Sequence, residues 1–142
     1  MQAGEERLTP HIHKVQIYYE DTDFSGVVYH ANYLRYFERA REHLLGVDEL
    51  VRLYRDHGVG FVVYRAEMIF KEGAQHGDTL EIRTTARAES IYRIVFDQQV
   101  WKSNGKAAMV RGTVELAAVH DDKGLVPIPP TVVESLKSRW PN

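Results

Sequence analysis

The sequence predicts an α+β fold in which one long helix packs against an antiparallel sheet. Residues 30–45 carry apolar side chains at helical spacing. Four segments rich in β-branched and aromatic residues follow, and the Asn104-Gly105 pair between two of them is a strong hairpin signal. Strands gathered after one main helix, in a chain of 142 residues, are typical of a single α+β domain over residues 1–142.

The chain begins with a predicted strand and a polar loop. Residues 11–20 alternate between apolar and polar side chains, with one slip of phase near Lys14, and are rich in branched and aromatic residues. Residues 21–26 are mostly polar and end in Gly26. We therefore expect the first strand to lead through a loop into the long helix.

The long helix is predicted to have one apolar stripe and clear ends. Gly46 is placed to end it, because glycine favours the position just after a helix. Asp48 is placed to cap a second, shorter helix, which Gly58 would end. The apolar stripe consists of Tyr33, Tyr36, Phe37, Ala40 and Leu44.

Four further strands and a terminal helix complete the prediction. A helix over residues 30–45 is about 24 Å long, which covers one face of a sheet but not its edges. Because an unpaired edge is open to another chain, we expect a second subunit to complete the structure. The predicted strands span residues 60–71, 79–88, 92–102 and 107–120, and the terminal helix spans residues 131–139.

Composition and charge exclude several classes of protein. The net charge of −2 argues against a general nucleic-acid binder, and no stretch approaches the ~20 apolar residues of a membrane span. The chain has no cysteine, and residues 1–10 lack the apolar run of a secretory signal. His11 and His13 have no convincing third metal ligand nearby. We expect a cytoplasmic domain without cofactor, metal, membrane span or nucleic-acid partner.

The most specific feature is residues 18–33, which read YYEDTDFSGVVYHANY. This segment contains an Asp-x-Asp pair, a glycine three residues later, a Val-Tyr-His triplet and then an aromatic-rich helix. It resembles the 4-hydroxybenzoyl-CoA thioesterase group of the hotdog superfamily and is most similar to the YbgC-type acyl-CoA thioesterases. Phe24 and Ser25 differ from some members of this family, and we expect these two positions to affect acyl preference.

The resemblance implies a fold, an activity and an assembly. The fold would be the hotdog fold, with a long central helix wrapped by a five-stranded antiparallel sheet. The activity would be hydrolysis of an acyl-CoA to a free acid and CoA. Subunits would pair into a continuous sheet with two active sites at the interface, as a homodimer or a homotetramer.

The resemblance also places the catalytic carboxylate on Asp23 and the amide that polarises the thioester carbonyl on His30 or its neighbour. No cysteine is available and Ser25 has no evident base nearby, so a carboxylate is the natural general base or nucleophile. No Ser, Thr or Asp at residues 29–31 caps the helix, which leaves its first amides free to form an oxyanion hole. The simpler interpretation is that Asp21 and Asp23 only cap the loop.

Several neighbouring residues have two interpretations. Tyr29, Asn32 and Tyr33 are predicted to shape the acyl pocket, although Tyr33 is equally a core residue and Asn32 is equally a helix cap. His30 is expected to act through its backbone N–H, while its ring packs near the helix end.

Charged residues outside the motif are also candidates. Some distant hotdog thioesterases use a helix glutamate as the base, but Glu38 is spaced to form a surface salt bridge with Arg41. The phosphates of CoA call for basic groups, and Arg93 is the predicted contact, with a plain surface charge as the alternative.

Two other functions remain open at this stage. A hotdog dehydratase or hydratase would need a histidine and a carboxylate converging on one carbon, and His30 is the only nearby ring. A non-catalytic adaptor would bind acyl chains or a partner such as acyl carrier protein, although the sequence contains no separate interaction segment.

Overall fold

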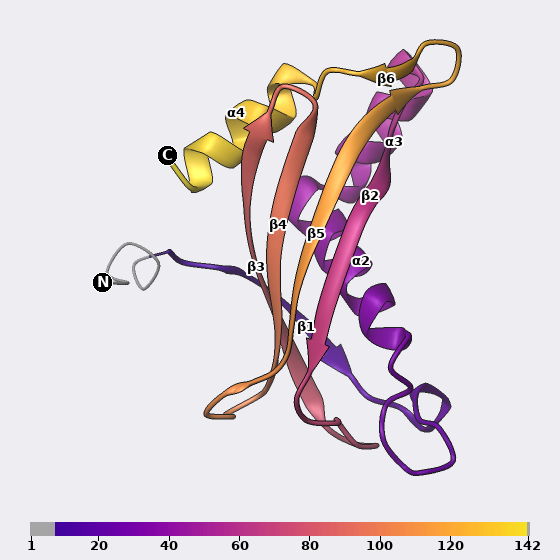
Figure 1. Cartoon of the computed structure of the whole chain (residues 1–142), viewed down its shortest axis with the longest axis vertical. Coiled ribbons are helices and arrows are strands. Elements are labelled where there is room, and N and C mark those ends of the chain that lie inside the picture. Colours follow the sequence, from indigo (N-terminus) through magenta and orange to yellow (C-terminus); the bar gives the residue numbers. More distant parts are fainter. Residues whose placement is uncertain (1–7, 142) are drawn as a thin grey trace.

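The computed structural model describes residues 8–141 and has a six-stranded antiparallel sheet with helix α2 along one face (Figure 1). The strand order is β1-β3-β4-β5-β2, and the short strand β6 pairs with the end of β5. The strands are β1 His11–Gln16, β2 Val59–Phe70, β3 Thr79–Ser90, β4 Arg93–Lys102, β5 Ala108–His120 and β6 Gly124–Val126. The predicted α+β hotdog architecture is confirmed, with β6 as an addition to the five expected strands. Residues 1–7, part of the segment without an apolar run, lie outside the described residues.

The first strand is shorter than predicted. It ends at Gln16, and Tyr19–Asp21 form a single turn of 3-10 helix, η1. The Asp21 carboxylate accepts the backbone N–H of Tyr18 at 2.8 Å, which turns the chain where a strand would have continued. The motif residues therefore lie on a compact loop at one end of the sheet.

The helices follow the predicted order. They are α2 Asn32–Leu45, α3 Val47–His57 and α4 Pro130–Arg139. Gly46 ends α2 with a φ of 97°, and Gly58 ends α3 in the left-handed region with a φ of 68°. The prediction that Asp48 caps the second helix is wrong. Gly46 is the residue immediately before α3, so Asp48 lies in the first turn and forms no cap.

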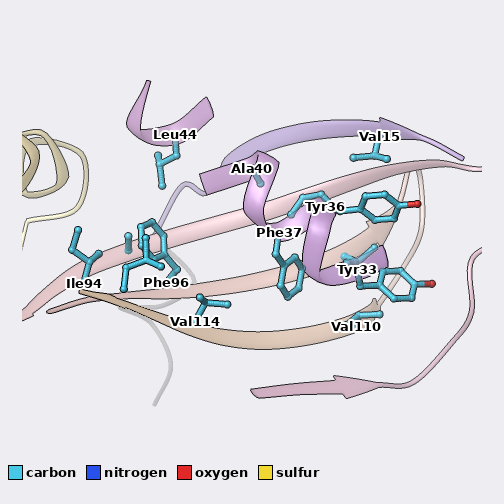
Figure 2. Packing of buried hydrophobic residues seen from close by; sticks show 14 of the residues in the cluster. Val15, Tyr33, Tyr36, Phe37, Ala40, Leu44, Ile94, Phe96, Val110 and Val114 are labelled. Carbon is cyan, nitrogen blue, oxygen red and sulfur yellow. The ribbon is translucent and has the colours of Figure 1, made fainter. Parts of the chain in front are cut away.

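The apolar stripe of α2 packs against the sheet. Tyr36 and Phe37 are at most 1% exposed, and Figure 2 shows the Phe37 ring near Val114 and the Tyr36 ring near Val15. Gly112 on β5 allows this close approach, because a Cβ atom there would lie 2.6 Å from the Phe37 ring. The helix is thereby fixed on the sheet, with its first residue beside the motif loop (Figure 1).

A polar network is buried beneath α2. Arg41 is 6% exposed, and its Nη1 donates to Gln98 Oε1 at 3.1 Å. The Gln98 amide nitrogen donates to the Phe37 carbonyl oxygen and to Thr84 Oγ1, both at 3.1 Å. The predicted surface salt bridge between Glu38 and Arg41 is therefore wrong, because Arg41 turns into the core.

Strand β2 lies at one end of the strand order and is twelve residues long. Its second edge has no strand partner within residues 8–141. Exposed apolar side chains on this strand are Val62, Val63, Tyr64, Ile69 and Phe70. Separately, none of the helices in this described range is both long and apolar enough to cross a membrane.

Candidate active site

The motif loop folds as a small hairpin with Asp23 near its tip. The Asp23 amide donates to the Val27 carbonyl oxygen at 2.9 Å, and the Gly26 amide donates back to the Asp23 carbonyl oxygen at 3.0 Å. Gly26 has a φ of 89°, which a glycine adopts without strain. Thr22 and Val28 form the next bridge of the hairpin. Asp23 is thus held in a hydrogen-bonded hairpin.

Three hydrogen bonds join this hairpin to the rest of the molecule. The Asn32 side-chain nitrogen donates to the Asp21 carbonyl oxygen at 2.9 Å, and the Tyr29 amide donates to the same oxygen at 3.0 Å. The Val28 amide donates to the Ala74 carbonyl oxygen at 2.8 Å. Asn32 is the first residue of α2 and ties the loop to the helix, so the alternative in which it caps the helix is wrong.

The Asp23 carboxylate is partly exposed and held in its ionised form. The backbone N–H of Ser25 donates to Asp23 Oδ1 at 2.9 Å, and the Ser25 hydroxyl donates to the same oxygen. These two hydrogen bonds, the hydroxyl first, lower the pKa of Asp23 below its usual value. At neutral pH the group is therefore a carboxylate with a second oxygen available.

The first turn of α2 lacks a side-chain cap, as the sequence predicted. Ala31 immediately precedes the helix, and no side-chain hydrogen bond caps the helix at this position. The amides of Asn32 and Tyr33 donate to the carbonyl oxygens of Tyr29 and His30. Within residues 8–141, the amides of His30 and Ala31 have no acceptor. These two N–H groups lie at the positive end of the helix dipole, where a negative oxygen would be stabilised.

Aromatic rings surround the start of α2. The His30 ring lies 4.8 Å from the Tyr29 ring and 6.0 Å from the Phe70 ring, measured between centroids. Tyr29 is 49% exposed, whereas Tyr33 is 2% exposed and its hydroxyl oxygen accepts the Ala74 amide at 3.1 Å. Tyr33 is therefore part of the core, whereas Tyr29 and His30 are exposed at the surface.

Two features near Asp23 were missed in the sequence. The sequence shows no base near Ser25, but in the structure the Ser25 hydroxyl donates a hydrogen bond to the Asp23 carboxylate. A serine two residues after an aspartate is a turn signal, and that signal could have indicated the contact. Tyr36 lies below the loop, and its buried hydroxyl has no hydrogen-bond partner within the described residues. Burial raises the pKa of Tyr36 strongly, and the nearby Asp21 carboxylate raises it further.

Arg93 is not brought to this site within one chain. Its guanidinium lies 4.0 Å from the centre of the Tyr64 ring, and its Nη1 lies 3.4 Å from Glu115 Oε1. Tyr64 precedes Phe70, the neighbour of the His30 ring, by six positions on β2. That separation is about 20 Å along a strand.

A hollow of the described structure lies away from this site. It has a volume of about 660 Å³ and is lined by Arg83, Asp97, Arg111 and Thr113, among others. Asp97 and Gln98 are neighbours on β4, so their side chains point to opposite faces of the sheet. Gln98 faces α2, to which it hydrogen-bonds, so Asp97 and this hollow lie on the face away from the helix. No group of three or more side chains suited to hold a metal occurs within residues 8–141, and His13 stacks on His43.

Comparisons with known proteins agree with this geometry. The model of the thioesterase-like superfamily matches residues 18–136. An acyl-CoA thioesterase YbgC of Haemophilus influenzae is 34% identical over 107 residues, covering 74% of this chain and 77% of that protein. The YbgC protein of Helicobacter pylori is 40% identical over 88 residues, covering 62% and 65%. A solved structure of a probable thioesterase from Bartonella henselae is 31% identical, covers 85% of this chain and 100% of that chain, and superposes with a TM-score of 0.76. The chain therefore belongs to the thioesterase-like superfamily, as a thioester hydrolase of the YbgC type with the hotdog fold.

Proposed function

We propose that the protein hydrolyses an acyl-CoA to a free acid and CoA at the start of α2, with Asp23 as the reacting carboxylate. The observation that carries the proposal is the pairing of two features. An ionised carboxylate is held on a short hairpin. Beside it, a helix begins with two amides, those of His30 and Ala31, that have no acceptor within residues 8–141. The relatives named as acyl-CoA thioesterases supply the substrate class.

In the general-base route, Asp23 removes a proton from water as the water oxygen adds to the thioester carbonyl carbon. The carbonyl oxygen becomes an oxyanion, which the His30 and Ala31 amides stabilise. When the tetrahedral intermediate collapses, the C–S bond breaks and the proton returns from Asp23 to the sulfur. Losing one oxyanion donor typically costs about 2.7–4 kcal/mol of transition-state stabilisation.

In the nucleophilic route, a carboxylate oxygen of Asp23 attacks the same carbon and expels the CoA thiolate. The product is a mixed anhydride between the acyl group and Asp23, which water then hydrolyses. A single turnover in ¹⁸O-labelled water tests the nucleophilic route. Label in Asp23 would establish it, because it requires water attack at the Asp23 carbonyl of the anhydride, whereas the general-base route and water attack at the acyl carbonyl both label only the released acid.

The remaining site residues have assigned places in this proposal. The backbone N–H of His30 contacts the oxyanion, and the exposed Tyr29 ring lines the acyl path. Asn32 acts indirectly, because its side chain holds the Asp21 carbonyl and with it the hairpin. Tyr33 supports the wall of the proposed acyl path from the core, because its hydroxyl oxygen accepts the Ala74 amide.

We further propose that two subunits pair through the free edge of β2, as a homodimer that a second pair can extend to a homotetramer. The second edge of this twelve-residue strand, which has no strand partner within residues 8–141, and its exposed Val62, Val63 and Ile69 support this pairing. In an antiparallel pair of β2 strands, the first half of one lies level with the second half of the other. Arg93 of the partner subunit would then be closer to His30 than the chain's own Arg93 is, and we assign it to the CoA phosphates. We place the reaction in the cytoplasm, as the composition favours.

The test is release of free thiol from a panel of acyl-CoA substrates. Asp23→Ala is expected to lose about 10⁴-fold in kcat/KM, the scale for removing the base or nucleophile, equivalent to about 5.4 kcal/mol. Glu20→Ala is the matched control, because Glu20 is an exposed carboxylate of the same loop outside the proposed site. Full activity of Asp23→Ala would remove Asp23 from the mechanism. Hydration of an enoyl-CoA without thiol release would favour a hydratase instead, and binding without turnover would favour an adaptor.

A further inference from the structure

Two histidines of β1 form a cluster with a histidine of α2. His11 and His13 alternate with Ile12 along β1, so both side chains lie on the same face of the sheet. The His13 ring stacks on the His43 ring, with 4.6 Å between centroids and 19° between ring planes. His43 belongs to the last turn of α2. The cluster therefore joins β1, at one end of the strand order, to the end of the long helix.

The charged groups that act on His11 and His13 within the described chain are all basic. Besides the histidines themselves, Arg39 of α2 lies near His13 and Arg139 of α4 lies near His11. Neither arginine forms an ion pair with a carboxylate of residues 8–141. The β3 residues that pair with the two histidines carry no charge. The cluster thus has no described acid that would stabilise a protonated ring.

The folded chain disfavours the charged form of both β1 histidines. Burial first, and the neighbouring positive charges second, lower the pKa of His11 and of His13 below the usual value. The His11 Nδ1 atom is buried and has no hydrogen-bond partner within the described residues. Protonation of this ring places an N–H on both nitrogens, and a buried donor without an acceptor destabilises the folded state.

The last helix meets the first strand at this cluster. Trp140, which follows α4, is 4% exposed, and its ring N–H donates to the Thr9 carbonyl oxygen just before β1 at 3.0 Å. The helix itself packs beside β3 through the buried Val132 and Leu136 (Figure 1). Strand β1 pairs only with β3 among the described strands. An edge strand and a terminal helix are the elements whose local opening costs least, and here the two are joined to each other.

We propose that His11, His13 and His43 form an acid-sensitive junction, and that their protonation releases β1 and α4 together from β3 and α2. Charged rings between Arg39 and Arg139 repel one another, and release separates and hydrates them. The sheet formed by β3, β4, β5 and β2 keeps its pairing. Release removes the strand that leads into the loop carrying Asp23.

The direction of the pH dependence follows from the neutral rings of the folded state. In the released state both β1 histidines take up a proton near their usual pKa of about 6.5. As the pH falls through about 6.5, the released state binds more protons than the folded state, so the folded state loses stability until the pH reaches the lower folded pKa. Between pH 7.5 and 5.5, each histidine can raise the opening equilibrium constant by up to about tenfold.

Hydrogen exchange of the full-length wild type at pH 7.5 and 5.5, corrected for the intrinsic pH dependence of exchange, measures the opening. Amides of β1 and α4 are expected to lose about tenfold to a hundredfold in protection on acidification, whereas amides of β4 and β5 should change by less than about threefold. An equal loss in all four elements would contradict release of β1 and α4 as a unit. No loss in β1 and α4 would overturn the proposal altogether.

Two charge reversals on α4 test the role of the cluster. Arg139→Glu places a carboxylate near His11 and favours the protonated ring, so the acid-induced loss of protection in β1 and α4 should be at least about threefold smaller than in wild type. Lys137→Glu is the matched control, because it makes the same charge change at an exposed position of the same helix that does not act on His11 or His13. This control should match wild type within about twofold. Equal responses of the two variants would contradict the role of the cluster.

Removal of the titrating rings gives an independent measurement. His13→Phe keeps a flat ring to stack on His43, and His11→Gln keeps a polar side chain, but neither new residue takes up a proton. In the double variant, protection of β1 and α4 should change by less than about threefold between the two pH values. His57→Gln removes an exposed histidine of α3 and should respond as wild type does. If the double variant does not fold, His13→Phe alone should respond at least about threefold less than wild type, and an unchanged response in whichever variant folds would overturn the proposal.

Discussion

Replacing Gln98 by leucine removes three hydrogen bonds, two of which join α2 to the sheet while the third joins β4 to β3. Gln98 is 1% exposed, accepts from Arg41 and donates to the Phe37 carbonyl oxygen and to Thr84. Two of these bonds join neutral groups, at about 1 kcal/mol each, and the bond to the guanidinium contributes about 1.5–3 kcal/mol. Leucine fills a similar volume but leaves Arg41 buried with no acceptor. We therefore expect Gln98→Leu to lower the free energy of unfolding by about 3–5 kcal/mol.

Urea denaturation followed by circular dichroism measures this change. Protein concentration must be held fixed, because assembly adds a concentration-dependent contribution to stability. Gln99→Leu is the matched control. Gln99 alternates to the other face of β4, where it accepts only the Trp101 ring N–H at 2.7 Å, and its replacement should cost about 1 kcal/mol.

A double variant sharpens the test. Arg41→Met combined with Gln98→Leu removes both partners, so it should be less destabilised than the sum of the single variants by about 1–3 kcal/mol. A loss below about 1 kcal/mol for Gln98→Leu alone would refute the reasoning that this network ties α2 to the sheet.

Three further outcomes follow from the structure. Ser25→Ala removes the hydroxyl that contributes most to the lowered pKa of Asp23, so protonation should begin at higher pH and the acid limb of the kcat/KM profile should move upward; no movement, or a downward one, would contradict this. Gly112→Ala places a Cβ atom 2.6 Å from the Phe37 ring and should lower the free energy of unfolding by about 1–3 kcal/mol in the same denaturation assay, whereas a neutral result would show that the helix has room to move. Tyr36→Phe removes a buried hydroxyl that has no hydrogen-bond partner within residues 8–141, so stability should stay equal or rise by up to about 1 kcal/mol, and a clear loss would reveal a hydrogen bond of that hydroxyl.

The local parts of the fold could be predicted from the sequence because their signals are local. Enrichment in β-branched and aromatic residues identified the strands, and Asn104, in the loop that joins β4 to β5, has a positive φ of 66°, which asparagine adopts more readily than most residues. Gly46 and Gly58 ended the helices as expected, because left-handed backbone favours glycine. The same locality explains the error at the first strand, where one hydrogen bond from the Tyr18 backbone N–H to the Asp21 carboxylate outweighed a weak alternation.

Arg41 shows where reasoning from residue type failed. Its charge suggested a surface position, yet its spacing from Phe37 and Leu44, four residues after the first and three before the second, places it on the apolar stripe. The partner that makes burial possible is Gln98, which lies 57 residues away in the chain. Long-range pairing of this kind leaves no local signal.

The candidate site was predictable in part. The motif pointed to Asp23 and to an uncapped helix start, and the structure has an ionised carboxylate and two amides without acceptors there. The shape of the loop depends on distant segments, because Val28 donates to Ala74, far along the chain. That anchoring follows only from the folded chain.

The most direct measurement of the central claim separates binding from chemistry in Asp23→Asn. Asparagine keeps an oxygen that accepts the Ser25 hydrogen bonds but is neither a base nor a nucleophile. Binding of a non-hydrolysable thioether analogue of the acyl-CoA should therefore remain within about threefold of wild type, while the single-turnover rate of thiol release falls by about 10⁴. A single-turnover rate within about tenfold of wild type would contradict the claim that the carboxylate at position 23 carries out the reaction.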